Sequence, residues 1–208
     1  MPLVVLPGRA PLLGFNAQEL GAAIAVAVRG SEESPEAVFE SLDRVLAATL
    51  AAAAQLDQAA LDLKMRERDR TLRELIHDIF YKALRWSEDA EPAPSGPRAA
   101  PGIRPSEGGQ KRQAARYADA PALVQYGEAA RDALRRRLAH SSGLDYGRVL
   151  STPDGPMTGA ELIAWLASHS AFHLRQLYWL MDHRLGVAPR ARPDLEGLPG
   201  VALPAELW

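Results

Sequence analysis

The stretch Thr158–Gly186, TGAELIAWLASHSAFHLRQLYWLMDHRLG, decides the fold class of this chain. Thr158, followed three residues later by Glu161, has the spacing of a capping box, in which each side chain bonds to the other residue's backbone N–H. Gly186 suits the position just after a helix, where a left-handed backbone is common. The stretch therefore predicts one long helix of roughly 40 Å.

Three other segments show the apolar spacing of amphipathic helices. The first begins at Ser34, a good N-cap residue, with Pro35 in the first helical position. The other two follow Asp69 and Asp119. With no strand pattern between the segments, the sequence predicts an all-α protein, an antiparallel four-helix bundle. The predicted apolar stripes are Val38, Leu42, Val45, Thr49, Ala53 and Leu56; Leu72, Leu75, Ile76, Ile79, Phe80 and Ala83; and Leu123, Gly127, Ala130, Leu134 and Leu138.

A smaller unit is predicted before the bundle. In residues 1–33, the segments Leu3–Leu6 and Ala10–Leu13 suggest a small β-hairpin around a Pro-Gly turn, and Ala17–Val28 suggests a short helix. We therefore divide the chain into residues 1–33 and a bundle of residues 34–208.

Two proline-rich segments belong to the bundle. The crossover loop 87–118 contains five prolines, so no regular helix is expected in it. It is predicted to be either a mobile lid near the functional site or a passive linker. The C-terminal tail, Val187–Trp208, contains four prolines and is predicted to lie extended along the surface.

The composition excludes several classes of protein. Of the 208 residues, 47% are hydrophobic and 24% are charged, as in ordinary globular proteins. The net charge of -2 indicates no basic face for nucleic acid, and the longest apolar runs are too short to cross a bilayer. We expect a cytoplasmic protein with neither a nucleic-acid nor a membrane partner. Because cysteine is absent, nitrogen and oxygen ligands must hold any metal ion.

Histidines are the best candidates for chemistry. His169 and His173 are four residues apart on the predicted long helix, so both side chains lie on one face. His77 lies at the flank of the second apolar stripe and could face the same cleft. Three imidazoles with one open position would suit a catalytic zinc, nickel or iron ion. Alternatively, the histidines make ordinary hydrogen bonds at a helix interface.

The segments RDRTLRELIHDIF, DGPMTGAELIAW, HSAFHLRQLYWLMDHRLG and LPAELW resemble the DinB/YfiT-like superfamily of metal-binding four-helix bundles. This resemblance extends over about residues 34–208. It implies one divalent metal ion at His77, His169 and His173. Similar proteins are divalent-metal-dependent thiol transferases that use bacillithiol, mycothiol or glutathione, and others are isomerases or hydrolases. We expect a thiol S-transferase that takes a small-molecule thiol and an electrophilic substrate.

The sequence also permits other functions. The first alternative is a metal-dependent hydrolase or isomerase of the same fold, and the second is a noncatalytic metal-binding module that dimerises. Gln176 could hydrogen-bond a metal ligand or substrate, or simply cap a buried polar group. Tyr81, four residues after His77, could donate a proton or be a core residue with its hydroxyl at the rim.

The N-terminal segment PLVVLPGRAPLLGFNAQELG resembles the last hairpin and helix of a glutaredoxin-like fold. Without cysteine it cannot carry out glutaredoxin chemistry. We expect it to serve in packing or in the contact of a homodimer, since a lone hairpin is only marginally stable.

Overall fold

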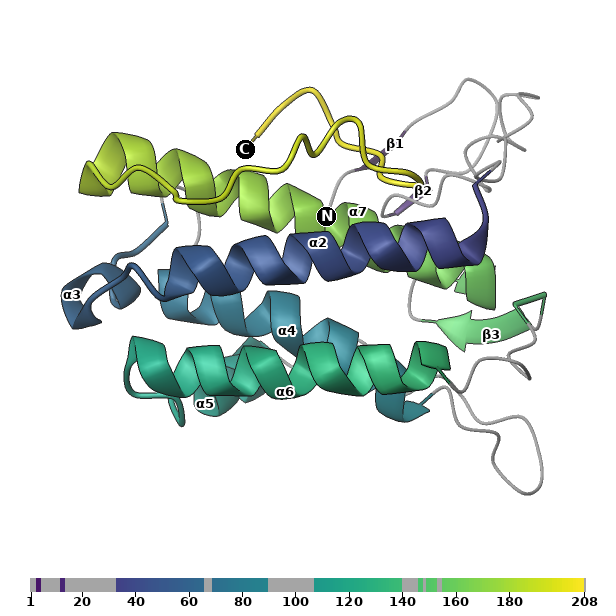
Figure 1. Ribbon diagram of the computed structural model, residues 1–208, viewed down its shortest axis with the longest axis horizontal. Coiled ribbons are helices and arrows are strands. Elements are labelled where there is room, and N and C mark those ends of the chain that lie inside the picture. Colours follow the sequence, from purple (N-terminus) through teal and green to yellow (C-terminus); the bar gives the residue numbers. More distant parts are fainter. Residues whose placement is uncertain are drawn as a thin grey trace.

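The computed structural model describes residues 3–4, 12–13, 33–65, 69–89, 107–139, 146–147, 149–152 and 155–207. Four long helices form an all-α bundle, as predicted (Figure 1). They are α2 (Pro35–Ala53), α4 (Leu72–Asp89), α6 (Ala120–Ala139) and α7 (Gly159–Leu180). Two short helices, α3 (Gln58–Leu61) and α5 (Glu107–Ala114), belong to the connections, and α7 continues into a π-helical turn, η2 (Met181–Leu185).

Each long helix packs mainly against two others. α2 contacts α6 and α7, and α4 contacts the same two helices, so α2 and α4 lie across the bundle from each other. α2 and α7 run in one direction, and α4 and α6 run in the other (Figure 1). Because α4 and α6 are parallel neighbours, the chain must return along the bundle between them. This requirement explains the long connection that separates these two helices in the sequence.

The helix ends follow local sequence signals. The Ser34 side chain accepts a hydrogen bond from the Ala37 backbone N–H, and Pro35 occupies the first turn of α2. At the start of α7, Thr158 Oγ1 accepts from the Glu161 N–H at 3.2 Å, and a Glu161 carboxylate oxygen accepts from the Thr158 N–H at 2.7 Å. Gly186 ends η2 with a left-handed φ of 65°. The predicted helix thus ends where expected, with a π-helical last turn.

The core lies between the four helices. The stripe predicted on the first helix is buried throughout, from Val38 to Leu56. Phe39 and Phe80 are fully buried among aliphatic side chains from all four helices. Burying each such side chain stabilises the fold by about 1.5–3 kcal/mol relative to exposure.

The prediction that the crossover loop 87–118 lacks regular helix is wrong at both ends. α4 continues to Asp89, and α5 occupies residues Glu107–Ala114 despite two glycines. Tertiary contacts explain α5: Ala114 is buried, and Lys111 pairs with Asp69 at 2.8 Å. Helix propensity alone does not include such contacts. The lid prediction concerns mainly residues 90–106, which lie outside the described residues.

The prediction of no strands between the helices is also wrong. Strand β3 (Val149–Thr152) pairs antiparallel with β4 (Gly155–Thr158), with Val149 opposite Thr158 and Thr152 opposite Gly155. The two strands are only four residues long and contain two residues, Gly155 and Pro156, that are poor strand formers. The last residue of this hairpin, Thr158, is the N-cap of α7.

The predicted N-terminal hairpin is present in part. β1 (Leu3–Val4) pairs antiparallel with β2 (Leu12–Leu13), with Leu3 opposite Leu13. The predicted helix Ala17–Val28 lies outside the described residues, and the division of the chain at residue 33 stays a prediction. Among the described residues, no helix is both long enough and apolar enough to cross a membrane.

We predict that Gly127→Ala destabilises the bundle although alanine is the better helix former. A Cβ at position 127 would lie 2.5 Å from the Phe80 ring and 2.8 Å from Leu50. The overpacking cost of about 1–3 kcal/mol should exceed the gain of about 1 kcal/mol in helix propensity. Urea denaturation should show a lower midpoint for this variant. In the control, Glu128→Ala at the exposed next position, the midpoint should stay near that of the wild type; an unchanged midpoint for Gly127→Ala would contradict the close helix packing.

Candidate metal centre

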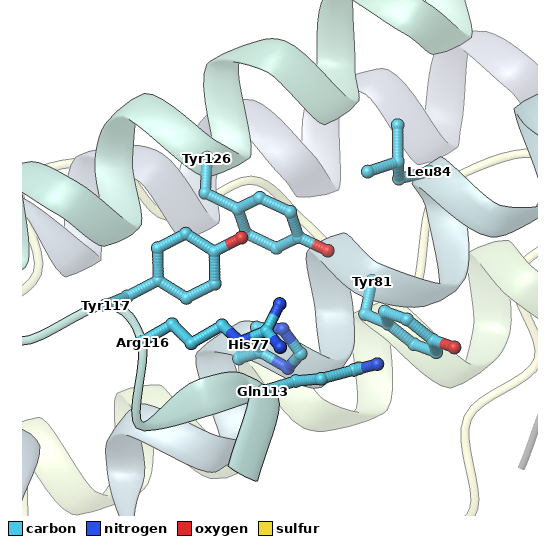
Figure 2. Close-up of a pocket in the computed structure, with 7 residues that line it drawn as sticks. All are labelled: His77, Tyr81, Leu84, Gln113, Arg116, Tyr117 and Tyr126. Carbon is cyan, nitrogen blue, oxygen red and sulfur yellow. The ribbon is translucent and has the colours of Figure 1, made fainter. Parts of the chain in front are cut away.

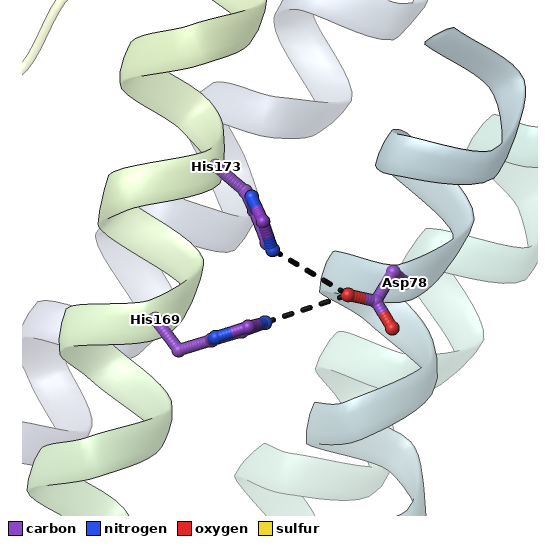
Figure 3. A group of neighbouring side chains, drawn as sticks. All are labelled: Asp78, His169 and His173. Atoms are coloured by element: carbon purple, nitrogen blue, oxygen red, sulfur yellow. Dashed lines mark hydrogen bonds and ion pairs between the residues drawn. The ribbon is translucent and has the colours of Figure 1, made fainter. Parts of the chain in front are cut away.

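Asp78, His169 and His173 converge between α4 and α7 (Figure 3). The two histidines lie one turn apart on α7, and Asp78 faces them from α4. The Nε2 atoms of His169 and His173 lie 3.4 Å and 3.6 Å from Asp78 Oδ2. One ligand atom from each residue lies within 4.8 Å of the others, which is close enough for a single ion.

The Asp78 carboxylate is buried and nonetheless ionised. Only 2% of the residue is exposed. Burial by itself would raise its pKa, but the neighbouring His169 ring and the positive charges of Lys82 and Arg70 hold the pKa well below its usual range. The carboxylate therefore supplies a full negative charge to the cluster.

Two cations share this carboxylate. Arg70 Nη2 and Lys82 Nζ each lie 3.1 Å from Asp78 Oδ2. The Lys82 ammonium is also 2.5 Å from His169 Nε2, and it lies over the Trp165 ring at 5.5 Å from the centroid. The carboxylate oxygen and the imidazole lone pair thus already bind a positive charge. Atoms that bind an ammonium ion in this way are also suitable ligands for a metal cation.

Gln176 determines the orientation of His173. His173 Nδ1 donates to Gln176 Oε1 at 2.8 Å, and Gln176 Nε2 donates to the backbone carbonyl of Leu207 at 2.9 Å. With its proton on Nδ1, the His173 ring keeps the Nε2 lone pair on the side of Asp78. Gln176, proposed from the sequence either as a ligand-binding residue or as a cap, therefore contacts His173 and the C-terminal tail.

Both histidines of the cluster are neutral. Burial lowers the pKa of His169 from 6.5 to about 4, against the opposing effect of Asp78. The pKa of His173 is lowered well below 6.5, again mainly by burial and then by the neighbouring His169. A neutral imidazole is the form that binds a metal ion.

His77, the third ligand expected from the sequence, lies elsewhere. Its ring stacks with Tyr126 at a centroid distance of 5.2 Å and with Tyr81 at 5.6 Å, in a pocket on the side of α4 that faces α5 and α6 (Figure 2). The structure thus brings His169 and His173 together with Asp78, and places His77 and Tyr81 in a different environment. Burial lowers the pKa of His77 to about 4.

Sequence reasoning missed Asp78, although a signal was present. Asp78 stands between His77 and Ile79 in an otherwise apolar stripe, and Lys82 follows at the i+4 position. A carboxylate in such a stripe is rarely buried without partners. The pattern does not, however, show which of the two adjacent residues faces α7, because consecutive helical residues differ by about 100° in direction.

The ligand atoms and their number define what the cluster can do. One carboxylate oxygen and two imidazole nitrogens form a set that suits zinc, nickel or iron. Three protein ligands leave at least one coordination position for water or substrate, as in catalytic rather than structural sites.

Comparisons with known proteins agree with the fold. The sequence profile of the DinB superfamily matches residues 42–177, more than half of the chain. No curated protein matches the chain. Among solved structures, a histidine-to-alanine mutant of the mycothiol-dependent maleylpyruvate isomerase superposes with a TM-score of 0.56 at 14% identity. The match covers 70% of this chain but only 61% of the isomerase, and it shows a common fold.

We predict that the metal-free protein loses stability as the pH falls from 6.5 towards 4. The pKa values of His77 and His169 are about 4 in the folded state, below the ordinary 6.5, so the unfolded state binds more protons in this interval. The stability due to these neutral rings is complete above pH 6.5 and is lost towards pH 4. Urea denaturation in EDTA at several pH values should show this decline.

The variant His77→Phe provides the control for this prediction. It keeps a buried aromatic ring and removes one titrating group, so its stability should fall less steeply with pH than that of the wild type. An equal decline in both proteins would show that His77 does not titrate differently on unfolding.

Proposed function

The chain belongs to the DinB superfamily, and from this membership we propose that it binds one divalent metal ion through Asp78, His169 and His173 and catalyses thiol S-transfer. The observation that carries the proposal is the Asp78 carboxylate, 2% exposed, placed within 3.6 Å of two neutral imidazole nitrogens. A buried negative charge with adjacent lone pairs favours a cation.

The proposed reaction takes its nucleophile from a substrate and not from the protein. A divalent ion at the cluster would supply a Lewis acid that makes a thiol or water nucleophilic near neutral pH. Because the chain has no cysteine, a sulfur nucleophile must come from a substrate. In the proposed transfer, the thiol loses its proton and its sulfur forms a bond to an electrophilic carbon, from which a leaving group departs.

A low-molecular-weight thiol is the proposed cosubstrate. The structural neighbour is named as mycothiol-dependent, which supports this class of thiol without identifying the one used here. Its name also favours the alternative of a thiol-dependent isomerase, in which the thiol adds to the substrate and is released again. Zinc, nickel and iron remain candidates for the metal, since each suits nitrogen and oxygen ligands.

The residues around the cluster have separate roles in this proposal. Gln176 positions His173 through the Nδ1 proton, and Trp165 stacks on the His169 ring at a centroid distance of 4.9 Å. Lys82 must give up its contacts with Asp78 and His169 before an ion can take their place. Homodimerisation through the N-terminal unit and a cytoplasmic location remain parts of the proposal.

The noncatalytic alternative is favoured by one observation. The Lys82 ammonium contacts Asp78 Oδ2 at 3.1 Å and His169 Nε2 at 2.5 Å and so already satisfies two of the three ligands, and the cluster could serve as a buried ion-pair network. Such a network would hold α4 against α7 without any metal. Metal binding therefore has to be measured before turnover.

We predict that the wild-type protein binds one equivalent of zinc or nickel, and that Asp78→Asn and His169→Ala each lose this binding. Removing one of three ligands leaves too few for stable coordination. Isothermal titration of the EDTA-treated protein, together with elemental analysis, measures the stoichiometry. The variant His77→Phe should still bind one equivalent, because His77 lies outside the cluster.

The same titration decides between the two ligand sets and tests whether Lys82 competes with the metal. Loss of binding in His77→Phe with binding retained in Asp78→Asn would support the set expected from the sequence. Lys82→Met should bind zinc more tightly than the wild type by on the order of tenfold, because it removes a competing cation from the site. Equal affinities would show that the ammonium does not compete.

We further predict metal-dependent turnover with a small thiol. Purified protein in its native metal form should be screened with bacillithiol, mycothiol or glutathione against electrophiles, with thiol consumption followed over time. EDTA treatment and the Asp78→Asn substitution should both abolish activity, and added metal should restore it only in the wild type. Stoichiometric metal without turnover of any pair would favour the noncatalytic module.

A further inference from the structure

A second candidate site lies on another side of α4. A pocket of about 210 Å³ opens between α4, the α5–α6 turn and α6, away from the α7 side where Asp78 lies. Its polar and aromatic lining is formed by His77, Tyr81, Gln113, Arg116, Tyr117 and Tyr126 (Figure 2). The catalytic proposal above does not use these residues.

Aromatic rings stack on one another in this pocket. The His77 and Tyr126 rings are nearly parallel, at 10° with centroids 5.2 Å apart. Tyr117 stacks on Tyr126 at 4.5 Å, and Tyr81 stacks with His77 at 5.6 Å and 23°. A group of parallel rings favours a planar aromatic ligand that packs against it in an offset or edge-on arrangement.

One buried polar atom beside these rings has no protein partner. Gln113 Oε1 is buried and lacks a hydrogen bond within the described part of the chain. His77, which also lines the pocket, is only 2% exposed. A buried polar atom without a partner costs about 1–3 kcal/mol, so such an atom at a pocket indicates a ligand that satisfies it.

The charge at the pocket is positive. Arg116 is exposed, its side chain extends over His77 in Figure 2, and it forms no ion pair with a described residue. No Asp or Glu lines the pocket among the residues that the structure describes. A guanidinium binds a carboxylate through two parallel hydrogen bonds.

Hydrogen bonds from α4 hold the α5–α6 turn, which forms one side of the pocket, in place. The Arg73 guanidinium, on a residue that is 7% exposed, donates to the backbone carbonyls of Tyr117 and Ala118 at 2.5 Å each. It also pairs with Asp62 at 2.6 Å. These bonds fix the α5–α6 turn on α4, so Arg116 and Tyr117 are presented to His77 by a rigid support.

We propose that this pocket binds a single-ring aromatic carboxylate that carries a hydroxyl group. The ring packs against the stacked rings of His77 and Tyr126, the carboxylate pairs with Arg116, and the hydroxyl donates to Gln113 Oε1. A volume of 210 Å³ suits a ligand of this size, since pockets for drug-sized molecules measure about 300–1,000 Å³. Binding there requires no metal ion.

The test uses the full-length protein after EDTA treatment, with 4-hydroxybenzoate as the probe. Isothermal titration and saturation-transfer NMR should show one bound molecule. Arg116→Gln should weaken binding by on the order of tenfold, because it removes a charge-assisted pair. Arg112→Gln, at an exposed arginine of α5 outside the pocket, is the matched control and should bind like the wild type. 4-Hydroxybenzyl alcohol, which lacks the carboxylate, should bind weakly and equally to all three proteins.

Other outcomes overturn the proposal. Absence of binding at millimolar probe would remove the site, and equal weakening by Arg112→Gln would reduce it to general electrostatic attraction. Binding that appears only with added metal, or that Asp78→Asn abolishes, would place the probe at the metal cluster instead. Failure of metal binding in the earlier titrations leaves this test unaffected, because the probe is measured without metal.

Discussion

A buried carboxylate, Asp78, is the constraint around which this bundle is arranged. An ionised group in the core costs several kcal/mol unless partners surround it. Here the partners come from two helices and the segment before one of them: Arg70 and Lys82 from the α4 side, and His169 and His173 from α7. Their positions require one rotation of α4 and one register between α4 and α7. The polar cluster therefore determines how two apolar helices meet, which hydrophobic contacts alone specify poorly.

That rotation gives α4 two functional faces. Asp78 faces α7 and the histidine pair, whereas His77, the preceding residue, faces the aromatic pocket beside α5 and α6. Neighbouring helical residues point about 100° apart, so one step in sequence separates two chemically different environments. One environment holds a carboxylate, two imidazoles and the two cations that pair with the carboxylate, and the other presents a guanidinium and aromatic rings.

The C-terminal tail is coupled to the cluster through α7. Arg175 donates to the carbonyls of Pro204 and Glu206 at 2.6 Å and 3.0 Å, and Gln176 binds the carbonyl of Leu207. Since Gln176 also holds the His173 Nδ1 proton, the tail helps to fix the ring that faces Asp78. Leu195 and Leu198 are buried, so the tail, although it has no regular secondary structure, forms part of the packed fold.

The sequence by itself determined the four long helices and several of their caps, because these depend on local spacing and on side chains within a few residues. Ser34, Thr158, Glu161 and Gly186 act where the sequence placed them, and the all-α bundle and the pairing of His169 with His173 on one helix face follow from the same local rules. Only the tertiary structure decided that Asp78 rather than His77 meets that pair, that α5 is helical, and that β3 and β4 pair. Each of these depends on contacts between residues far apart in the chain, such as Arg73 with Tyr117 or Lys82 with His169, and the energies of such contacts are absent from any local pattern.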